Sequence, residues 1–218
     1  MIQLVSSEII HLLAQRAVYW PAQRTLVIAD IHFGKAAAFR AKGVPVPHGT
    51  TMQNLTALDL LISQHAVDTI VFLGDFLHAR SARAATTLGA MLGWRERNPA
   101  LHLLLVRGNH DLHAGDPPAG MRIEVVDEPH AIGPFTFCHH PGARPETYVF
   151  AGHVHPVFRL SRRSDALRLP CFVVGPQHMI LPSFGAFTGG HAVTASAGER
   201  IFVAVDEVVV AVPGPVGA

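Results

Sequence analysis

The stretch Thr69-Ile70-Val71-Phe72-Leu73-Gly74-Asp75 decides the fold. Its apolar run, rich in β-branched and aromatic side chains, predicts a strand that is buried on both faces. Gly74 permits a sharp exit from this strand and leaves Asp75 at its carboxyl end, where open α/β sheets bind ligands. The alternative is that Asp75 caps a following helix, which is a frequent use of aspartate.

Length and composition set the class of protein. The 218 residues are enough for one sizeable core, and we expect a single domain over residues 1–218 with a flexible Pro/Gly-rich tail at 213–218. Hydrophobic residues make up 49% of the chain and charged residues 15%, which excludes a disordered protein. The formal net charge of +1 gives no argument for nucleic-acid binding by bulk charge, although it leaves room for a local basic patch.

The cysteines and the apolar segments bear on the compartment. Cys138 and Cys171 form no CxxC pair and no disulfide framework, which favours a reducing compartment. No signal-peptide pattern opens the chain, and no apolar run is long enough to span a bilayer. The sequence therefore predicts a cytoplasmic protein with no membrane partner. Its 15 histidines are a large number for this length and would suit a metal site.

Four further apolar runs, like the one before Asp75, are followed by polar side chains. Residues 25–29, 101–106, 134–139 and 148–151 read as strands. The polar residues that follow them are Asp30 and His32, Asn109 and His110, His139, and His153 and His155. Asp30 and His32 are two residues apart, so in extended chain they would share a face. Any one of these motifs has a plain explanation such as a turn.

Together the five strand ends predict a metal centre. Unpaired carboxylates and imidazoles gathered at one sheet edge would repel one another or stay unsatisfied, and cations resolve both problems. The donors are oxygen and imidazole without thiolate, which suits Mn, Fe, Zn or Co and argues against a structural zinc knuckle. There are too many donors for one ion. We therefore expect two divalent ions that share Asp75.

The intervening segments predict helices and supporting loops. A helix with an apolar stripe should begin at 49–51, with Thr50 or Thr51 as its N-cap, and a second should cover 81–97. Alternation along 134–139 places Cys138 and His139 on opposite faces, so Cys138 should belong to the core. The glycine-rich loop 181–190 could wall the cleft.

The order of the motifs, D-x-H, G-D, G-N-H-D, a strand histidine and G-H-x-H, resembles the calcineurin-like binuclear metallophosphoesterases. The resemblance implies a four-layer αββα sandwich and a catalytic role for His110. We prefer His139 to His140 as the strand histidine, because it lies on the strand and is the first polar residue after the apolar run. The implied ligands are Asp30, His32, Asp75 and His155 for the first metal, and Asp75, Asn109, His139 and His153 for the second.

A closer resemblance covers nearly the whole chain. The segment 29–35, the Gly43-Val44-Pro45-Val46-Pro47 loop and Leu181-Pro182-Ser183-Phe184-Gly185 are similar to the bacterial DNA-ligase-associated metallophosphoesterases. Members of that family are encoded beside a DNA ligase, a helicase and an exonuclease. The resemblance implies a manganese-dependent phosphodiesterase, specifically an endonuclease that acts on single-stranded DNA in bacterial DNA repair.

Several basic residues are candidate substrate contacts. Lys35 and Arg107 could contact a phosphate, with a solvated charge or a structural salt bridge as the alternative, and His78 could support or cover the site. A basic patch that follows a nucleic-acid strand could be formed by Arg80, Arg83, Arg159, Arg162 and Arg163.

Two other functions stay open, namely a small-molecule or cyclic-nucleotide phosphodiesterase and a non-catalytic scaffold. The intact ligand set and His110 argue against the scaffold.

Overall fold

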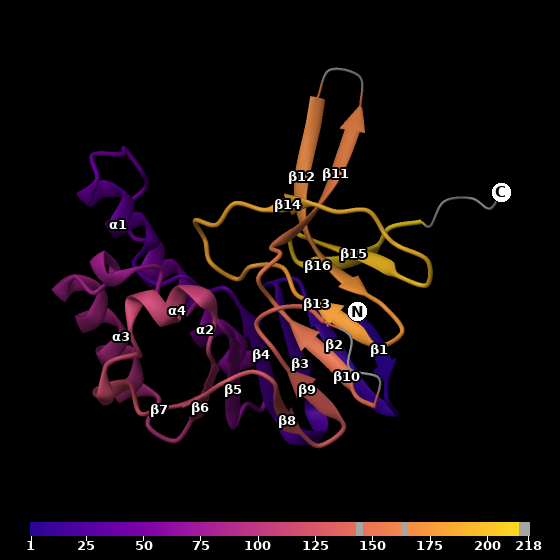
Figure 1. The fold of residues 1–218 in the computed structure, drawn as a ribbon, viewed down its shortest axis with the longest axis horizontal. Helices are drawn as coiled ribbons and strands as arrows, with labels where there is room; N and C mark the ends of the chain where they lie inside the picture. The colour runs from indigo at the N-terminus through magenta and orange to yellow at the C-terminus, as the bar shows by residue number, and fades with distance from the viewer. Residues whose placement is uncertain (143–145, 163–164, 214–218) are drawn as a thin grey trace.

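The first half of the chain forms a sheet in the order β1-β2-β3-β4-β5-β6-β7, seen in the computed structural model of residues 1–142, 146–162 and 165–213 (Figure 1). The strands predicted at 25–29, 69–73 and 101–106 are confirmed as β4, β5 and β6. Strands β4 to β7 are parallel and β1 to β4 are antiparallel. Their bounds are β1 Ile2–Val5, β2 Glu8–Leu13, β3 Ala17–Trp20, β4 Thr25–Ala29, β5 Thr69–Leu73, β6 His102–Val106 and β7 Ile123–Val126.

The second half forms another sheet, in the order β14-β11-β12-β13-β10-β9-β8, with β15 paired to β12 and β16 to β15. Strands β9, β10 and β13 are parallel, and β11 and β12 form a hairpin that projects from the molecule (Figure 1). The bounds are β8 His130–Ile132, β9 Phe135–Phe137, β10 Tyr148–Ala151, β11 Pro156–Arg162, β12 Asp165–Val174, β13 His178–Ile180, β14 His191–Ala192, β15 Arg200–Val205 and β16 Val208–Ala211.

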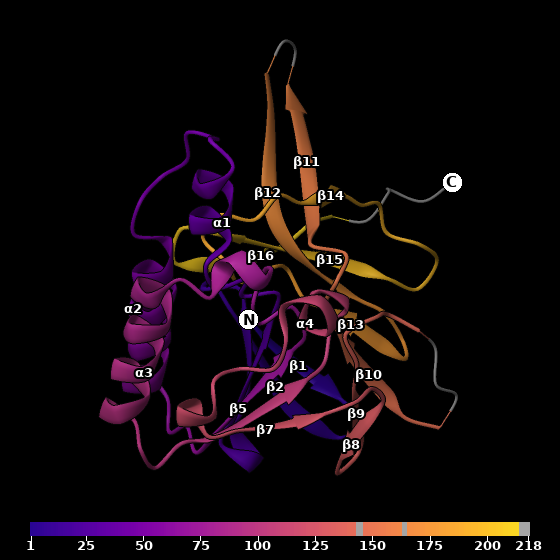
Figure 2. The ribbon, with the colours of Figure 1, turned by 60° about the vertical axis from the view of Figure 1, so that its left-hand side comes forward.

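The α-helices of the described residues all come from residues 35–114, and Figure 2 shows α1, α2 and α3 on one side of the first sheet. Their bounds are α1 Lys35–Ala41, α2 Thr50–Gln64, α3 Ala85–Arg97 and α4 Asn109–Ala114; short 3-10 turns are η1 Pro21–Gln23, η2 Arg80–Ala82 and η3 Ala119–Met121. None of the helices in this part of the chain is long and apolar enough to cross a membrane.

Two details of the predicted helices are wrong. Residues 81–97 do not form one helix, because Ala84 has an extended backbone (ψ 143°) that separates η2 from α3. No threonine side chain caps α2. Its N-cap is Gly49 in the left-handed conformation, and Thr50 is already the first helical residue.

Strand alternation builds the two core layers. Ile70 and Phe72 on β5 pack with the helices, whereas Val71 and Leu73 pack between the two sheets. β4 and β6 divide their side chains in the same way. Each fully buried large apolar side chain contributes about 1.5–3 kcal/mol, so this double burial fixes the register of the central strands. The prediction of an α/β sandwich with two sheets and helices is confirmed.

The same pairing aligns the ends of the strands. In the first sheet Ala29 lies opposite Leu73, and Leu73 lies opposite Val106. The parallel strands therefore end at one edge, and the loops that carry Asp30, Asp75 and Asn109 leave the sheet side by side. In the second sheet, strands β9 and β10 are also parallel, and their carboxyl ends lie beside the same edge.

Candidate metal centre

Asp30, His32, Asp75 and His155, called here the inner group, bring one ligand atom each within 4.8 Å of one another. His32 Nε2 lies 3.6 Å from Asp75 Oδ2, and His155 Nε2 lies 3.3 Å from Asp30 Oδ1. Asp30 is fully buried, and His32 and Asp75 are nearly so. Asp30 and His155 are 125 positions apart in the sequence, and the fold brings them together here.

The inner group is left unsatisfied by the protein. Asp30 Oδ1, both ring nitrogens of His32 and His155 Nε2 are buried without a hydrogen-bond partner among the described residues. Burial lowers the pKa of His32 well below its usual range, and the nearby Lys35 lowers it further, so the ring is neutral. Unpartnered buried polar atoms cost free energy, and a neutral imidazole is the form that binds metals. The group therefore fits a divalent cation.

The backbone at this edge is unusual. Asp30, His32, Asp75, His153 and His155 all have positive φ values of 48–67°. Asp30 and His32 thus do not share the face of an extended strand as expected; they converge because the chain turns through left-handed residues. Such conformations cost on the order of 1–3 kcal/mol each and cluster at functional sites.

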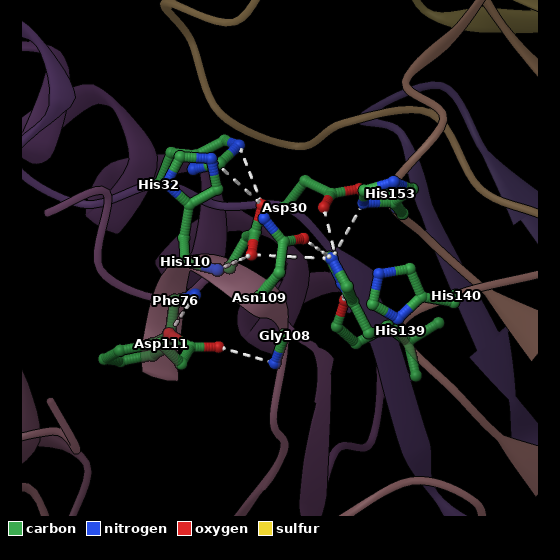
Figure 3. A network of polar contacts seen from close by, with 12 residues as sticks. Asp30, His32, Phe76, Gly108, Asn109, His110, Asp111, His139, His140 and His153 are labelled. Carbon is green, nitrogen blue, oxygen red and sulfur yellow. Dashed lines mark hydrogen bonds and ion pairs between the residues drawn. The ribbon is translucent and has the colours of Figure 1, made fainter. Parts of the chain in front are cut away.

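The outer group consists of Asn109, His139 and His153, and it faces the inner group across Asp75. His139 Nε2 lies 2.9 Å from Asn109 Oδ1, 3.1 Å from His153 Nδ1 and 3.5 Å from Asp75 Oδ1 (Figure 3). On its other side His139 Nδ1 lies 3.0 Å from Leu73 O. A proton on Nδ1 that is donated to this carbonyl leaves the lone pair of Nε2 facing the other donors, where a cation would bind.

His139 and His140 take different positions. His139 is fully buried within the outer group, whereas the His140 side chain is 46% exposed. His140 Nδ1 lies 2.6 Å from Glu128 Oε1, and the backbone N–H groups of His139 and His140 both donate to Glu128 Oε2. His140 still lies within 4.8 Å of His139 and His153. This geometry supports the preference for His139 and reveals Glu128 as its support.

Asp75 lies between the two groups. Its Oδ2 faces His32 and its Oδ1 faces His139, and Oδ1 also accepts a hydrogen bond of 3.0 Å from the backbone N–H of His110. Asp75 does not cap the helical turn directly after it, since η2 has no side-chain cap; its bond to His110 reaches the first turn of α4 instead. Each carboxylate oxygen of Asp75 thus faces one group, as it must if two cations are to share this residue.

His110 lies in the same cleft but has different partners from Asn109. Its Nδ1 is 2.7 Å from the carbonyl oxygen of His78, and its Nε2 is 3.8 Å from Asp75 Oδ2. Its ring stacks on that of His78, and its side chain is 37% exposed. Burial, followed by the charges of Lys35 and His110, lowers the pKa of His78 to about 4. A proton on His110 Nδ1 bonds the His78 carbonyl and leaves Nε2 facing Asp75 Oδ2.

The comparisons with known proteins agree with this geometry. The model of the calcineurin-like phosphoesterase family matches residues 23–142, more than half of the chain. The chain belongs to the calcineurin-like phosphoesterase family. It is a metal-dependent phosphoesterase, and its two sheets and helices form the sandwich of that family.

Solved structures extend the comparison. The crystal structure of nuclease MPE from Pseudomonas putida shares 45% identity over 94% of this chain and 96% of its own, with a TM-score of 0.84. A protein of unknown function from Aquifex aeolicus is 20% identical over 60% of this chain and 78% of its own (TM-score 0.41). An uncharacterized predicted phosphoesterase from Streptococcus pneumoniae is 13% identical over 84% and 82% (TM-score 0.33). Among the curated proteins, none matches the chain.

The basic residues proposed as substrate contacts have different surroundings in the structure. Lys35 is half-buried beside the inner group, where burial lowers its pKa while Asp75 and Asp30 raise it. Arg107 instead forms the structural salt bridge that was the alternative, with Asp116 at 3.0 Å and Asp127 at 2.6 Å. Arg80 and Arg83 donate to backbone carbonyls at or near α4. Arg159 is exposed on β11. Arg163 and the side chain of Arg162 lie outside the part of the chain that the structure describes.

Asp111 supports the site from a buried position that the sequence analysis missed. It accepts hydrogen bonds from the backbone N–H groups of Gly108, Phe76 and Leu77, at 2.9, 2.9 and 3.3 Å (Figure 3). These bonds join the loop after β5 to the start of α4. The signal was available, because an acid three residues after Gly108 is typical of a helix start.

Asn54 and Ser183 hold the loop 181–190 against the inner group. Asn54 on α2 donates to Ile31 O and accepts from Ala186 N–H, both at 2.9 Å, and Ser183 Oγ donates to Asp30 O at 2.8 Å. These bonds place the loop against the backbone that carries Asp30 and Ile31. Asn54 was missed, although a polar side chain at an inward helical position is itself a signal.

Proposed function

We propose that this phosphoesterase cleaves the phosphodiester bonds of single-stranded DNA endonucleolytically and acts in bacterial DNA repair. The observation that carries the proposal is the 45% identity, over 94% of the chain, to a protein solved as a nuclease. The convergence of the inner and outer groups on Asp75 supports it, because phosphodiester hydrolysis commonly uses two metal ions.

We assign two divalent cations, one to each group. The inner group would hold the first, and Asp75 with the outer group would hold the second. The donors are carboxylate, amide and imidazole without thiolate, which suits Mn²⁺ as the physiological metal, with Fe, Zn or Co as alternatives. When bound, such a pair supplies an activated water and neutralises phosphate charge.

The chain's own side chains have complementary roles. His110 Nε2 faces the cleft, so it can donate a proton to the leaving sugar oxygen or stabilise charge on the phosphoryl group. The His78 carbonyl fixes the orientation of the His110 ring. The charge of Lys35 interacts with Asp75 and Asp30, and Lys35 forms no ion pair within the described residues, so we assign it to a substrate phosphate. Arg107 receives no such role because two carboxylates already hold it.

We place the protein in the cytoplasm, because its proposed substrate is chromosomal DNA. Cys138 and Cys171 are both buried, and a chain with only two cysteines and no disulfide framework suits a reducing compartment. The DNA ligase, helicase and exonuclease of a shared repair system are its proposed partners.

The test uses circular single-stranded DNA, which has no ends for an exonuclease. Protein stripped with a chelator should be inactive, and Mn²⁺ should restore nicking better than Mg²⁺, since Mg²⁺ prefers oxygen ligands and retains its waters. Nicking should fall steeply with salt, as phosphate contacts require. Asp75→Asn provides the inactive control of nearly identical shape.

Two outcomes would contradict the proposal. Hydrolysis of bis(p-nitrophenyl) phosphate without cleavage of any DNA would identify a small-molecule or cyclic-nucleotide phosphodiesterase. Metal-bound protein that hydrolyses neither substrate would identify a non-catalytic scaffold.

A further inference from the structure

A hollow of about 470 Å³ lies beside the inner group. It is lined by Lys35 and Phe39 of α1 and by Ala186, Phe187, Thr188 and Gly189 of the loop 181–190. Figure 1 shows the segment between β13 and β14 reaching toward α1, so the two walls come from distant parts of the chain. Within the described residues, no acidic side chain lines it.

A row of rings connects the hollow to the cleft. His110 stacks on His78 with ring centroids 4.9 Å apart, His78 lies 5.8 Å from Phe39, and Phe39 meets Phe187 edge to face at 6.0 Å. The wall is also joined to the inner group directly, because the Gly189 carbonyl lies 3.2 Å from His155 Nδ1. A ligand in the hollow therefore lies next to whatever occupies the cleft.

The lining has the chemistry of a base-binding site. Phe39 and Phe187 are half-buried, so part of each ring contributes to the surface of the hollow. Aromatic side chains bind unstacked bases of any sequence, because every base has a π-face. Lys35 lines the hollow together with both rings, and its charge also interacts with Asp75 and Asp30 of the inner group, so it can contact the phosphate that joins two nucleotides.

We propose that this hollow binds one nucleobase of a single-stranded nucleic acid, adjacent to the phosphate held in the metal cleft; this inference rests on the proposed function. The base stacks on the Phe39–Phe187 wall, and Lys35 contacts the backbone. A base must leave its stack to enter such a hollow, which is easiest in a strand that is already single. The hollow thus gives a physical reason for preference of single strands over duplex.

The experiment compares dT12 with a twelve-residue abasic strand of the same charge. Binding is measured by fluorescence anisotropy with chelator-treated protein, and kcat/KM is measured with Mn²⁺. Wild-type protein should favour dT12 in both assays. Phe39→Leu and Phe187→Leu should each lower this preference by about 5- to 150-fold, the usual effect of removing a base–aromatic stack, and Phe39→Trp should retain it.

Two further variants separate the contributions. Lys35→Met should weaken the binding of dT12 and of the abasic strand by the same factor, because it removes a phosphate contact and no base contact. Phe158→Ala is the matched control, since this half-buried ring packs against the separate cluster of Cys171, Ile201 and Val203. It should leave the preference for dT12 unchanged even if it lowers stability.

The outcomes distinguish the two proposals. Equal binding and cleavage of dT12 and the abasic strand by wild-type protein would overturn the base-binding hollow and leave the nuclease proposal standing. The same holds if wild type prefers dT12 and both leucine variants keep the full preference. Hydrolysis of bis(p-nitrophenyl) phosphate with no binding or cleavage of dT12 would overturn the proposed function itself and the hollow with it.

Discussion

The inner and outer groups contain similar donor atoms in different states. In the inner group the ring nitrogens of His32 and one oxygen of Asp30 are buried and have no hydrogen-bond partner within the part of the chain that the structure describes. In the outer group His139 is within hydrogen-bonding distance of both Asn109 and His153, and His153 is exposed. A cation entering the inner group satisfies atoms that nothing else satisfies, whereas one entering the outer group displaces existing contacts. We therefore expect the inner group to hold its ion more tightly.

The largest effect is expected where the groups meet. Asp75→Asn should remove both ions and lower turnover by about 10⁴-fold or more, because each ion contributes several kcal/mol and 1.36 kcal/mol is a factor of ten. Metal analysis and hydrolysis of bis(p-nitrophenyl) phosphate provide the measurements. Asp116→Asn, which loosens only the Arg107 ion pair, is the control. A variant that retains two ions per chain would show that Asp75 is not shared.

His110→Ala separates chemistry from metal binding in both groups. Turnover should fall by about 10²–10⁴-fold, the usual contribution of a positioned acid or base, with metal content unchanged. The loss should be mainly in kcat. It should be milder for a nitrophenolate leaving group than for a DNA sugar oxygen, which needs protonation. Equal losses for the two substrates would assign His110 to charge stabilisation, and loss of metal would refute the separation.

His153 and His155 test the comparison with a matched pair, since both follow β10 and both have left-handed backbones. His153→Ala should weaken only the outer ion, by at least about 10–100-fold, because losing a ligand costs no less than losing a supporting contact. His155→Ala should weaken the inner ion. Competition against a chromogenic chelator resolves the two binding steps. Loss of both ions in His153→Ala would show that the groups are not independent.

Glu128→Ala should produce a smaller effect that is confined to the outer group. Glu128 holds the backbone of His139 and the ring of His140, so its loss should weaken the outer ion by about 10-fold, the lower end of the usual range for a supporting contact. The same chelator competition measures it. An equal effect on the inner ion would indicate general destabilisation instead of a local role.

The last prediction concerns pH. Burial holds the pKa of His78 at about 4 in the folded protein, below the usual 6.5 of the unfolded chain, so between these values the unfolded state binds more protons. Stability of chelator-treated protein should therefore fall as pH falls from about 6.5 to about 4. His78→Phe should make this fall less steep in urea unfolding at several pH values, and His48→Phe, at an exposed position, should not. An unchanged slope in His78→Phe would show that His78 is not held neutral.

Local chemistry in the sequence determined the central strands and the donor types at their ends. An apolar run such as 69–73 is stable only where both of its faces are buried. The Gly-Asp that follows it therefore lies where the chain leaves the sheet, at the edge. The same local signals were insufficient for the helix at 81–97, because the extended backbone of Ala84 is set by its surroundings. They were also insufficient for Glu128, since a lone acid before a proline reads as a solvated charge.

Only the tertiary structure decided how these pieces meet. The sequence determined that Asp30 and His155 each follow an apolar strand, but their 3.3 Å approach depends on two sheets packing face to face. The left-handed turn at Asp30 and His32, the hydrogen bonds of Asn54 and the hollow beside Phe39 have the same origin. The physical reason is range: periodicity and polarity act between neighbouring residues, whereas these features arise from contacts between residues more than twenty positions apart.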